Sequence, residues 1–168
     1  MSKNLFPKSF LLLIIIILQS CVSAKITSNK DANYTRQPKR IYLMMNGSKK
    51  ANDFCVGFVR GFQNKLEEKG VKTSLYISDS LSLLDNDDIN KKIDEFSPEA
   101  VMIISQKEVH STNNMVDGGN FELTLVDRNT KKNVWKGEFD VYGQYGMTDA
   151  IDKSISELMK KLTEDKII

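Results

Sequence analysis

The sequence predicts an α/β fold: three layers (α/β/α), with a mixed five-stranded sheet between helices. Two observations indicate this class. Three segments carry apolar residues at helical spacing, and strand-like runs alternate with the first two of these segments. Two strand–helix–strand crossovers make three strands parallel, and right-handed connections place the first strand between the second and third. Two hairpin steps add two more strands. The predicted order is therefore 2-1-3-4-5, with strand 4 antiparallel.

The first predicted unit is a strand, a helix and a second strand. Residues 40–45 (RIYLMM) form the first strand, and a turn follows at 46–48. Residues 51–69 carry their apolar side chains on one helical face, and Gly70 follows as a C-cap. Residues 71–78 (VKTSLYIS) alternate between apolar and polar side chains, which predicts the second strand.

The second unit is a short helix and a buried strand. Acidic residues gather at the start of the predicted helix 87–96, where they favour the positive end of its dipole, and Pro98 marks its end. The run 85–88 also suggests calcium, but an EF-hand loop needs Gly at its sixth position and Glu at its twelfth. Helix capping explains these acids better. Residues 100–104 (AVMII) then predict a strand that is buried on both faces.

The last predicted elements are a hairpin and a closing helix. The two strands of the hairpin are 121–126 and 134–142, and Trp135 is on the inward face of the second strand. The helix runs from 148 to 162 with one apolar stripe. The stretch 106–119 is predicted as a loop, and we expect this loop and the outer edge of the hairpin to be contact surfaces.

The first twenty residues have the pattern of an export signal. Lys3 and Lys8 precede nine apolar residues, 10–18 (FLLLIIIIL). A membrane-spanning helix needs about 20 such residues, whereas the apolar region of a secretory signal has about 7–15. An ordinary cleaved signal and a buried core helix are the alternatives.

The four residues Leu18-Gln19-Ser20-Cys21, which begin with the last residue of the apolar run, resemble the lipobox of bacterial lipoproteins. The resemblance implies that the signal peptide 1–20 is removed and that Cys21 carries a thioether-linked diacylglycerol and an acyl chain such as palmitate. A stable hold on a bilayer needs two or three such chains. The implied location is the bacterial cell envelope, with the protein anchored by lipid in the outer membrane and facing the periplasm.

The chain after the signal is electrically balanced. The signal contains two of the 24 basic residues and no acidic ones, so 22 basic residues remain against 22 acidic residues. Nucleic-acid binding usually needs a basic face, and this composition gives no support for it. Residues 22–38 are polar and lack apolar periodicity, which predicts a flexible tether after the lipidated Cys21. Residues 39–168 then form a single domain.

The hairpin sequence FELTLVDRNTKKNVWKGEF, residues 121–139, resembles the late hairpin of small α/β envelope lipoproteins. These are the penicillin-binding-protein activators, the curli-secretion lipoprotein family and the amino-terminal domain of the Tol-system propeller protein. The resemblance implies an anticodon-binding-like module that is not an enzyme, needs no cofactor and presents its surface to another envelope protein.

No residue pattern indicates catalysis or a metal site. His110 is the only histidine, and no nucleophile motif accompanies it. Cys55 lies on the apolar stripe of the first predicted helix, which indicates core packing, and Gly57 and Gly61 predict close helix packing. One histidine and one remaining cysteine do not supply the usual ligand set of a zinc site.

The alternative function is small-ligand binding or hydrolysis at the carboxyl ends of the parallel strands. Ligands of open parallel sheets bind at such ends, near the point where the strand order reverses. The residues expected there are Asn46, Gly47, Ser48, Asp79 and Gln106. The neighbouring lysines 49 and 50 and the backbone N–H groups of the turn would suit an anion.

Overall fold

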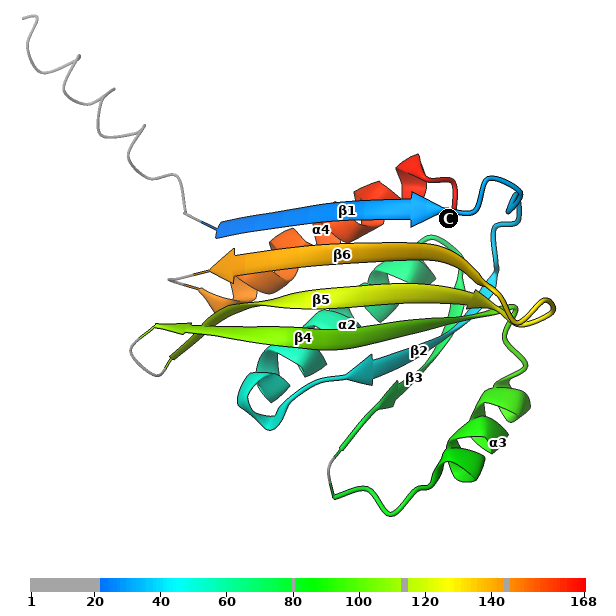
Figure 1. The fold of residues 1–168 in the computed structure, drawn as a ribbon, viewed down its shortest axis with the longest axis horizontal. Coiled ribbons are helices and arrows are strands. Elements are labelled where there is room, and N and C mark those ends of the chain that lie inside the picture. The colour runs from blue at the N-terminus through cyan, green and yellow to red at the C-terminus, as the bar shows by residue number, and fades with distance from the viewer. Residues whose placement is uncertain (1–21, 80, 113–114, 144–145) are drawn as a thin grey trace, which may run out of the picture.

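The computed structural model describes residues 22–79, 81–112, 115–143 and 146–168, which form one mixed sheet with helices on its faces (Figure 1). The strands are β1 (Val22–Lys30), β2 (Arg40–Asn46), β3 (Lys72–Ile77), β4 (Ala100–Thr112), β5 (Met115–Asp127) and β6 (Asn133–Gly143). The helices are α2 (Asn52–Glu68), α3 (Asn86–Phe96) and α4 (Met147–Glu164), with a 3₁₀ turn at Lys49–Ala51. The sheet order is β1-β6-β5-β4-β2-β3.

The five strands predicted from the sequence are present in the predicted order, with β2 between β3 and β4. β2 pairs in parallel with both neighbours, and β5 is antiparallel to β4 and β6. The sheet nevertheless has a sixth strand within the described residues. The predicted count of five is therefore wrong, although the predicted connections are confirmed.

The sixth strand is β1, and it lies in the segment 22–38 that was predicted to be a flexible tether. That prediction is wrong for residues 22–30, which pair antiparallel with β6, from Val22 opposite Gly143 to Lys30 opposite Trp135. Ala24 and Ile26 pack against the core. The next inward side chains are polar, and they bond Asp165 at the end of α4: Ser28 Oγ lies 2.5 Å from its Oδ2, and Lys30 Nζ lies 2.8 Å from its carbonyl oxygen. Residues 22–30 are therefore part of the sheet.

β4 and β5 are longer than predicted. The predicted loop 106–119 belongs largely to the two strands, which continue to Thr112 and start again at Met115. The pairing contains irregularities between Gln106 and Glu108 and between His110 and Ser111. The outer edge of the β5–β6 hairpin, predicted to be a contact surface, is paired with β1 of the same chain.

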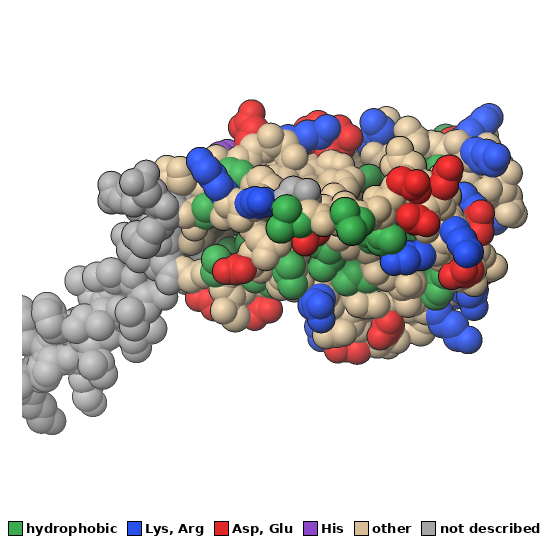
Figure 2. All heavy atoms as spheres, turned by 90° about the horizontal axis from the view of Figure 1, so that it is seen from below, with side chains coloured by type: hydrophobic (Ala, Val, Ile, Leu, Met, Phe, Trp, Pro, Cys, Tyr) green, Lys and Arg blue, Asp and Glu red, His purple; other side chains and the backbone are tan. Residues whose placement is uncertain are grey.

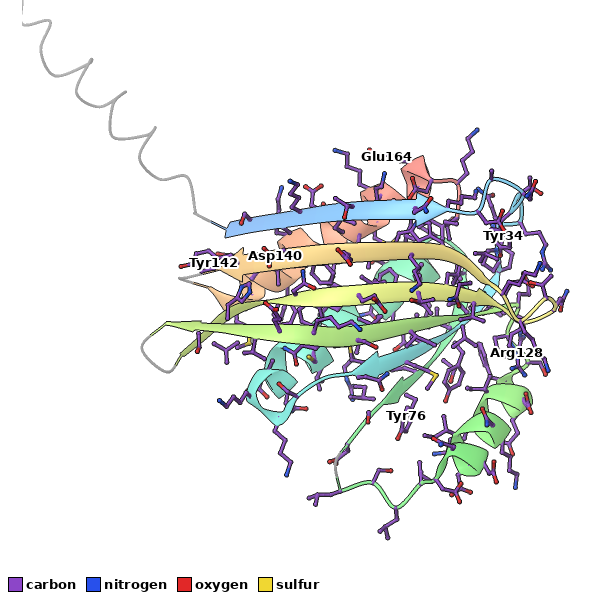
Figure 3. All side chains as sticks on the ribbon, viewed as in Figure 1. Tyr34, Tyr76, Arg128, Asp140, Tyr142 and Glu164 are labelled. Atoms are coloured by element: carbon purple, nitrogen blue, oxygen red, sulfur yellow. The ribbon has the colours of Figure 1, made fainter. Side chains whose placement is uncertain are left out.

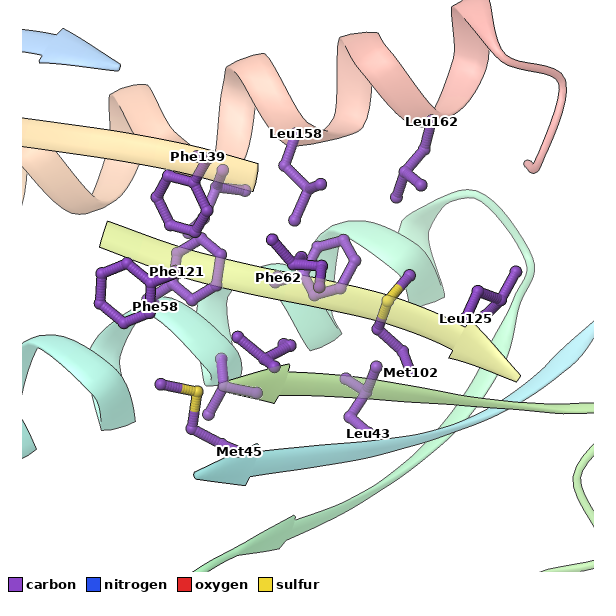
Figure 4. Close-up of a cluster of buried hydrophobic side chains, with 14 of the residues drawn as sticks. Leu43, Met45, Phe58, Phe62, Met102, Phe121, Leu125, Phe139, Leu158 and Leu162 are labelled. Atoms are coloured by element: carbon purple, nitrogen blue, oxygen red, sulfur yellow. The ribbon is translucent and has the colours of Figure 1, made fainter. Parts of the chain in front are cut away.

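One face of the sheet is covered by α2 and α4, and the main core lies there (Figure 4). Aromatic rings fill its centre: Phe121 and Phe139 stack with centroids 4.9 Å apart, and Phe58 lies 5.1 Å from Phe139. The predicted glycine pair lets the helices approach closely. A Cβ atom on Gly57 would lie 2.7 Å from Ile151 Cδ1, and one on Gly61 would lie 2.5 Å from Ile155 Cδ1.

Among the described residues, α3 is the helix that packs on the opposite face, against Tyr42 of β2 and Val101 of β4. Its buried cluster contains only Tyr42, Ile93 and Val101. The predicted capping by acids is confirmed, because Asp85 accepts hydrogen bonds from the backbone N–H groups of Asp87 and Asp88, each at 2.9 Å. The third layer of the predicted α/β/α arrangement is therefore a single short helix.

Candidate functional site

The crevice predicted at the strand ends is divided in the structure. Gly47, Ser48 and Asp79 line one open groove, together with Lys49 and the first turn of α2. Asn46 is exposed and does not line this groove. Gly47 packs directly on Cys55, because a Cβ atom there would lie 2.6 Å from the sulfur. The turn is therefore held by packing against α2.

Gln106 does not line the open groove. Its Oε1 accepts a hydrogen bond of 2.7 Å from the backbone N–H of Ser48, so the side chain holds the β2–α2 turn in place. Its Nε2 is buried without a hydrogen-bond partner among the described residues. Gln106 lines a small, mostly apolar pocket together with Phe54 and Phe121. Of the five predicted residues, only Gly47, Ser48 and Asp79 share one groove.

Cys55 and His110 were considered for catalysis, and the surroundings of both favour a structural role. Cys55 is buried, and burial raises the pKa of its thiol to about 11, which disfavours the reactive thiolate. The predicted core packing of Cys55 is confirmed. His110 lies on β4, where its ring nitrogens are each 3.8 Å from a carboxylate oxygen, of Glu108 and of Asp140. Across residues 22–79, 81–112, 115–143 and 146–168, no group of three His, Cys, Asp or Glu side chains is arranged to hold a metal ion.

Trp135 is buried, as predicted, and its indole N–H donates to Asp165 Oδ2 at 2.7 Å. The same carboxylate accepts the Ser28 hydroxyl, so Asp165 joins β1, β6 and the end of α4. Burial alone would raise the pKa of Asp165, but hydrogen bonds from Ser28, Trp135 and Lys161 outweigh it and lower the pKa below its ordinary value. The side chain is therefore a charged structural anchor.

An exposed apolar loop was missed by the sequence reasoning. Leu81 and Leu83 in the β3–α3 connection are 77 % and 99 % exposed, and Leu84 is also exposed. Figure 2 shows hydrophobic side chains gathered in the middle of the face seen from below Figure 1, the side on which β3 and α3 lie. The signal was the run LSLL between a strand and a helix, which neither element buries. Contiguous apolar side chains that are exposed to solvent are a feature of interaction surfaces.

The start of β1 defines one end of the molecule. Val22 is opposite Gly143, at the end of the sheet where Asp140 and Tyr142 lie in Figure 3, whereas Tyr34 and Arg128 lie at the other end. Cys21 and the predicted signal peptide fall outside the described residues. Among the helices that the structure does describe, none has the length and apolar character to cross a membrane.

The comparisons with known proteins identify similar folds. No family model and no curated protein matches the sequence. Among solved structures, a PelC dodecamer from Paraburkholderia phytofirmans is similar, with a TM-score of 0.57 and 10% sequence identity over 83% of this chain and 97% of that chain. A point variant of that PelC, also a dodecamer, has a TM-score of 0.56, with the same identity and coverage. At this identity the similarity concerns the fold.

Proposed function

We propose that this chain is a non-catalytic, lipid-anchored protein of the bacterial envelope, attached through an acylated Cys21 and facing the periplasm from the outer membrane. The domain serves protein–protein interaction. The lipobox-like sequence before Cys21 supports the anchor, and the surroundings of Cys55 and His110 favour structural roles over catalysis.

The observation that carries the proposal is the place where β1 starts. Val22, the residue after Cys21, is already paired with Gly143 in the sheet. An anchored Cys21 would therefore hold the domain directly at the membrane surface, with one end of the sheet toward the bilayer. The exposed leucines of the β3–α3 loop then supply an apolar surface for a partner protein.

The solved structures of similar fold are dodecamers, which favours copies of the same chain as partners. We infer that the domain is a building block of a homo-oligomer at the membrane. Other envelope proteins would then bind to the assembly rather than to a single copy.

Replacement of the anchoring residue tests the proposal. In a bacterial host, Cys21→Ser should abolish incorporation of labelled palmitate and move the protein from the membrane fraction to the periplasmic fraction. The matched control is Cys55→Ser, which changes the other cysteine and should leave both measurements as in the wild type. Incorporation of labelled palmitate into Cys21→Ser at the wild-type level would contradict the lipid anchor.

A further inference from the structure

We propose that copies of this chain assemble head to tail by sheet extension, with the β1 edge of one copy pairing antiparallel to the β3 edge of the next. The inference rests on the proposed lipid anchor and names the surfaces that make the oligomer. β1 and β3 are the two outermost strands of the sheet, so each has one edge that no described strand occupies.

The β3 edge is open to pairing. The backbone N–H groups of Lys72 and Ser78 donate to Lys39 and Met45 on the β2 side, each at 2.8 Å. Because backbone groups alternate in direction along a strand, those of Thr73, Leu75 and Ile77 point outward. No backbone hydrogen bond to these outward groups is found among the described residues.

The sequence of β3 does not protect this edge. Edge strands are usually blunted by proline, by charges or by a covering element. β3 (KTSLYI) has no proline, and its only charge is Lys72 at its first position. The exposed Leu81 and Leu83 follow at its carboxyl end and extend the apolar surface. β3 is therefore an unprotected edge strand beside exposed leucines, and a strand of another chain can pair with it.

The β1 edge supplies a matching partner. β1 has 9 residues against 6 in β3, which is long enough to pair over the whole of β3. Antiparallel pairing places the start of β1 beside the carboxyl end of β3. In the register that sets Thr27 opposite Ser74, Ile26 is opposite Leu75 and Ala24 is opposite Ile77, and all four side chains lie on the sheet face of the main core.

The anchor decides between a head-to-tail contact and a two-fold contact. Following the sheet from edge to edge, β3, β2 and β4 run in one direction and β1 runs in the opposite direction. Copies that are anchored to one membrane point the same way, so β1 of one copy meets β3 of the next in the antiparallel sense.

Two-fold pairing of β3 with β3 must also be antiparallel, because the offset hydrogen bonds of a parallel pair are not two-fold symmetric. It would place the two anchored ends at opposite ends of the dimer, away from a shared membrane. The geometry therefore favours a head-to-tail contact, which closes into a ring or continues as a filament.

Cysteine pairs across the contact test the proposal in the full-length chain. Thr27 and Ser74 lie on the same face of the sheet, near the middle of β1 and β3, since Thr27 is opposite Glu138 and Ser74 is opposite Tyr42. In isolated membranes, Thr27→Cys with Ser74→Cys should give a ladder of crosslinked multimers under mild oxidation. Lys25→Cys and Asn29→Cys, each combined with Ser74→Cys, cover register slips of two residues.

The controls separate this inference from the proposed function. Wild-type protein sets the background, because Cys55 is buried, and Ser74→Cys alone should give no dimer. A dimer from Ser74→Cys alone, or no ladder from any of the three double variants while the protein stays in the membrane fraction, would overturn the edge pairing and leave the anchor intact. Loss of the protein from the membrane fraction in all variants and in the wild type would instead overturn the anchor.

A surface variant provides a second, independent measurement. Leu83→Ser changes a side chain that is 99 % exposed, so it should not change the thermal midpoint of the detergent-dissociated protein. It should reduce the multimer ladder of the double-cysteine variant at least severalfold. Leu84→Ser is a comparison in the same loop. Leu84 is only 36 % exposed, so we expect this variant to reduce the ladder less than Leu83→Ser does. An unchanged ladder in Leu83→Ser would contradict a role for the apolar loop.

Discussion

The two faces of the sheet are stabilised to very different degrees. On one face, α2 and α4 cover a continuous core that includes five phenylalanine rings, Phe54, Phe58, Phe62, Phe121 and Phe139. On the other face, α3 covers a cluster with only three buried side chains. The strands β1, β5 and β6 present polar side chains on that second face, among them Lys25, Glu138 and Asp140, which are exposed.

This difference indicates which face of the sheet supplies most of the stability of the domain. Burial of apolar area is the main favourable term in folding, so the α2–α4 face accounts for most of the stability. α3 is held by a small cluster, by its capping box and by the Arg128–Asp94 ion pair at its carboxyl end. Since regions with few buried contacts open at lower free energy than the core, we expect α3 and the loop before it to exchange amide hydrogens first.

The largest expected effect comes from the centre of the main core. Phe58 is fully buried and contacts rings from both neighbouring strands, so Phe58→Ala removes a side chain at a site with little room to relax. We expect a loss of about 3–5 kcal/mol in the free energy of unfolding. Chemical denaturation measures this loss. A loss below about 1 kcal/mol would contradict the assignment of stability to this face.

The matched change on the other face is Ile93→Ala, which truncates the buried side chain of α3. We expect a cost of about 2 kcal/mol, at the low end for such truncations, because the small cluster can relax around the change. The cost should appear mainly as faster amide exchange in α3, while the amides of β4 and β5 keep their protection. Equal loss of protection in both places would show that the two faces unfold as one unit.

The prediction from sequence succeeded where burial leaves a regular pattern. AVMII in β4 and the apolar stripes of α2 and α4 are explained by the core they build, and the acids before α3 were correctly assigned to capping. β1 was missed because its inward side chains change from apolar at Ala24 and Ile26 to polar at Ser28 and Lys30, which find partners at Asp165. That compensation depends on a residue more than 130 positions away.

The candidate site was predictable in part. The β2–α2 turn and Asp79 do meet in one groove, as expected from the parallel strands. Gln106 was placed in the same crevice because β4 was predicted to end at Ile104, but β4 continues and turns this side chain toward Ser48 and Phe54. The exposed leucines at 81 and 83 were not selected as a site, because apolar residues in a sequence do not reveal whether a neighbouring element buries them.

The smallest effect that we predict concerns Asp127 at the β5–β6 turn. The next residue, Arg128, forms the ion pair with Asp94 of α3. Asp127 is buried and accepts hydrogen bonds from Thr130 and Arg36. Burial alone would raise the pKa of its carboxyl group, but these partners outweigh it and hold the pKa below its ordinary value of 3.8. The charged form is thus the one that the fold favours.

A carboxyl group with a lowered pKa in the folded state stabilises the protein above its unfolded-state pKa, and this contribution disappears as the pH falls through the folded-state value. We therefore expect Asp127→Asn to cost about 1.5 kcal/mol at pH 7. The difference in the free energy of unfolding between wild type and variant should shrink as the pH is lowered from 6 to 3. Asp94→Asn, which removes the charge that pairs with Arg128 on the α3 side, is the matched control; its exposed pair should contribute at most about 1 kcal/mol at any pH. If the cost of Asp127→Asn were the same at pH 3 as at pH 7, the carboxylate could not be the source of the stability, and the turn would be held by packing alone.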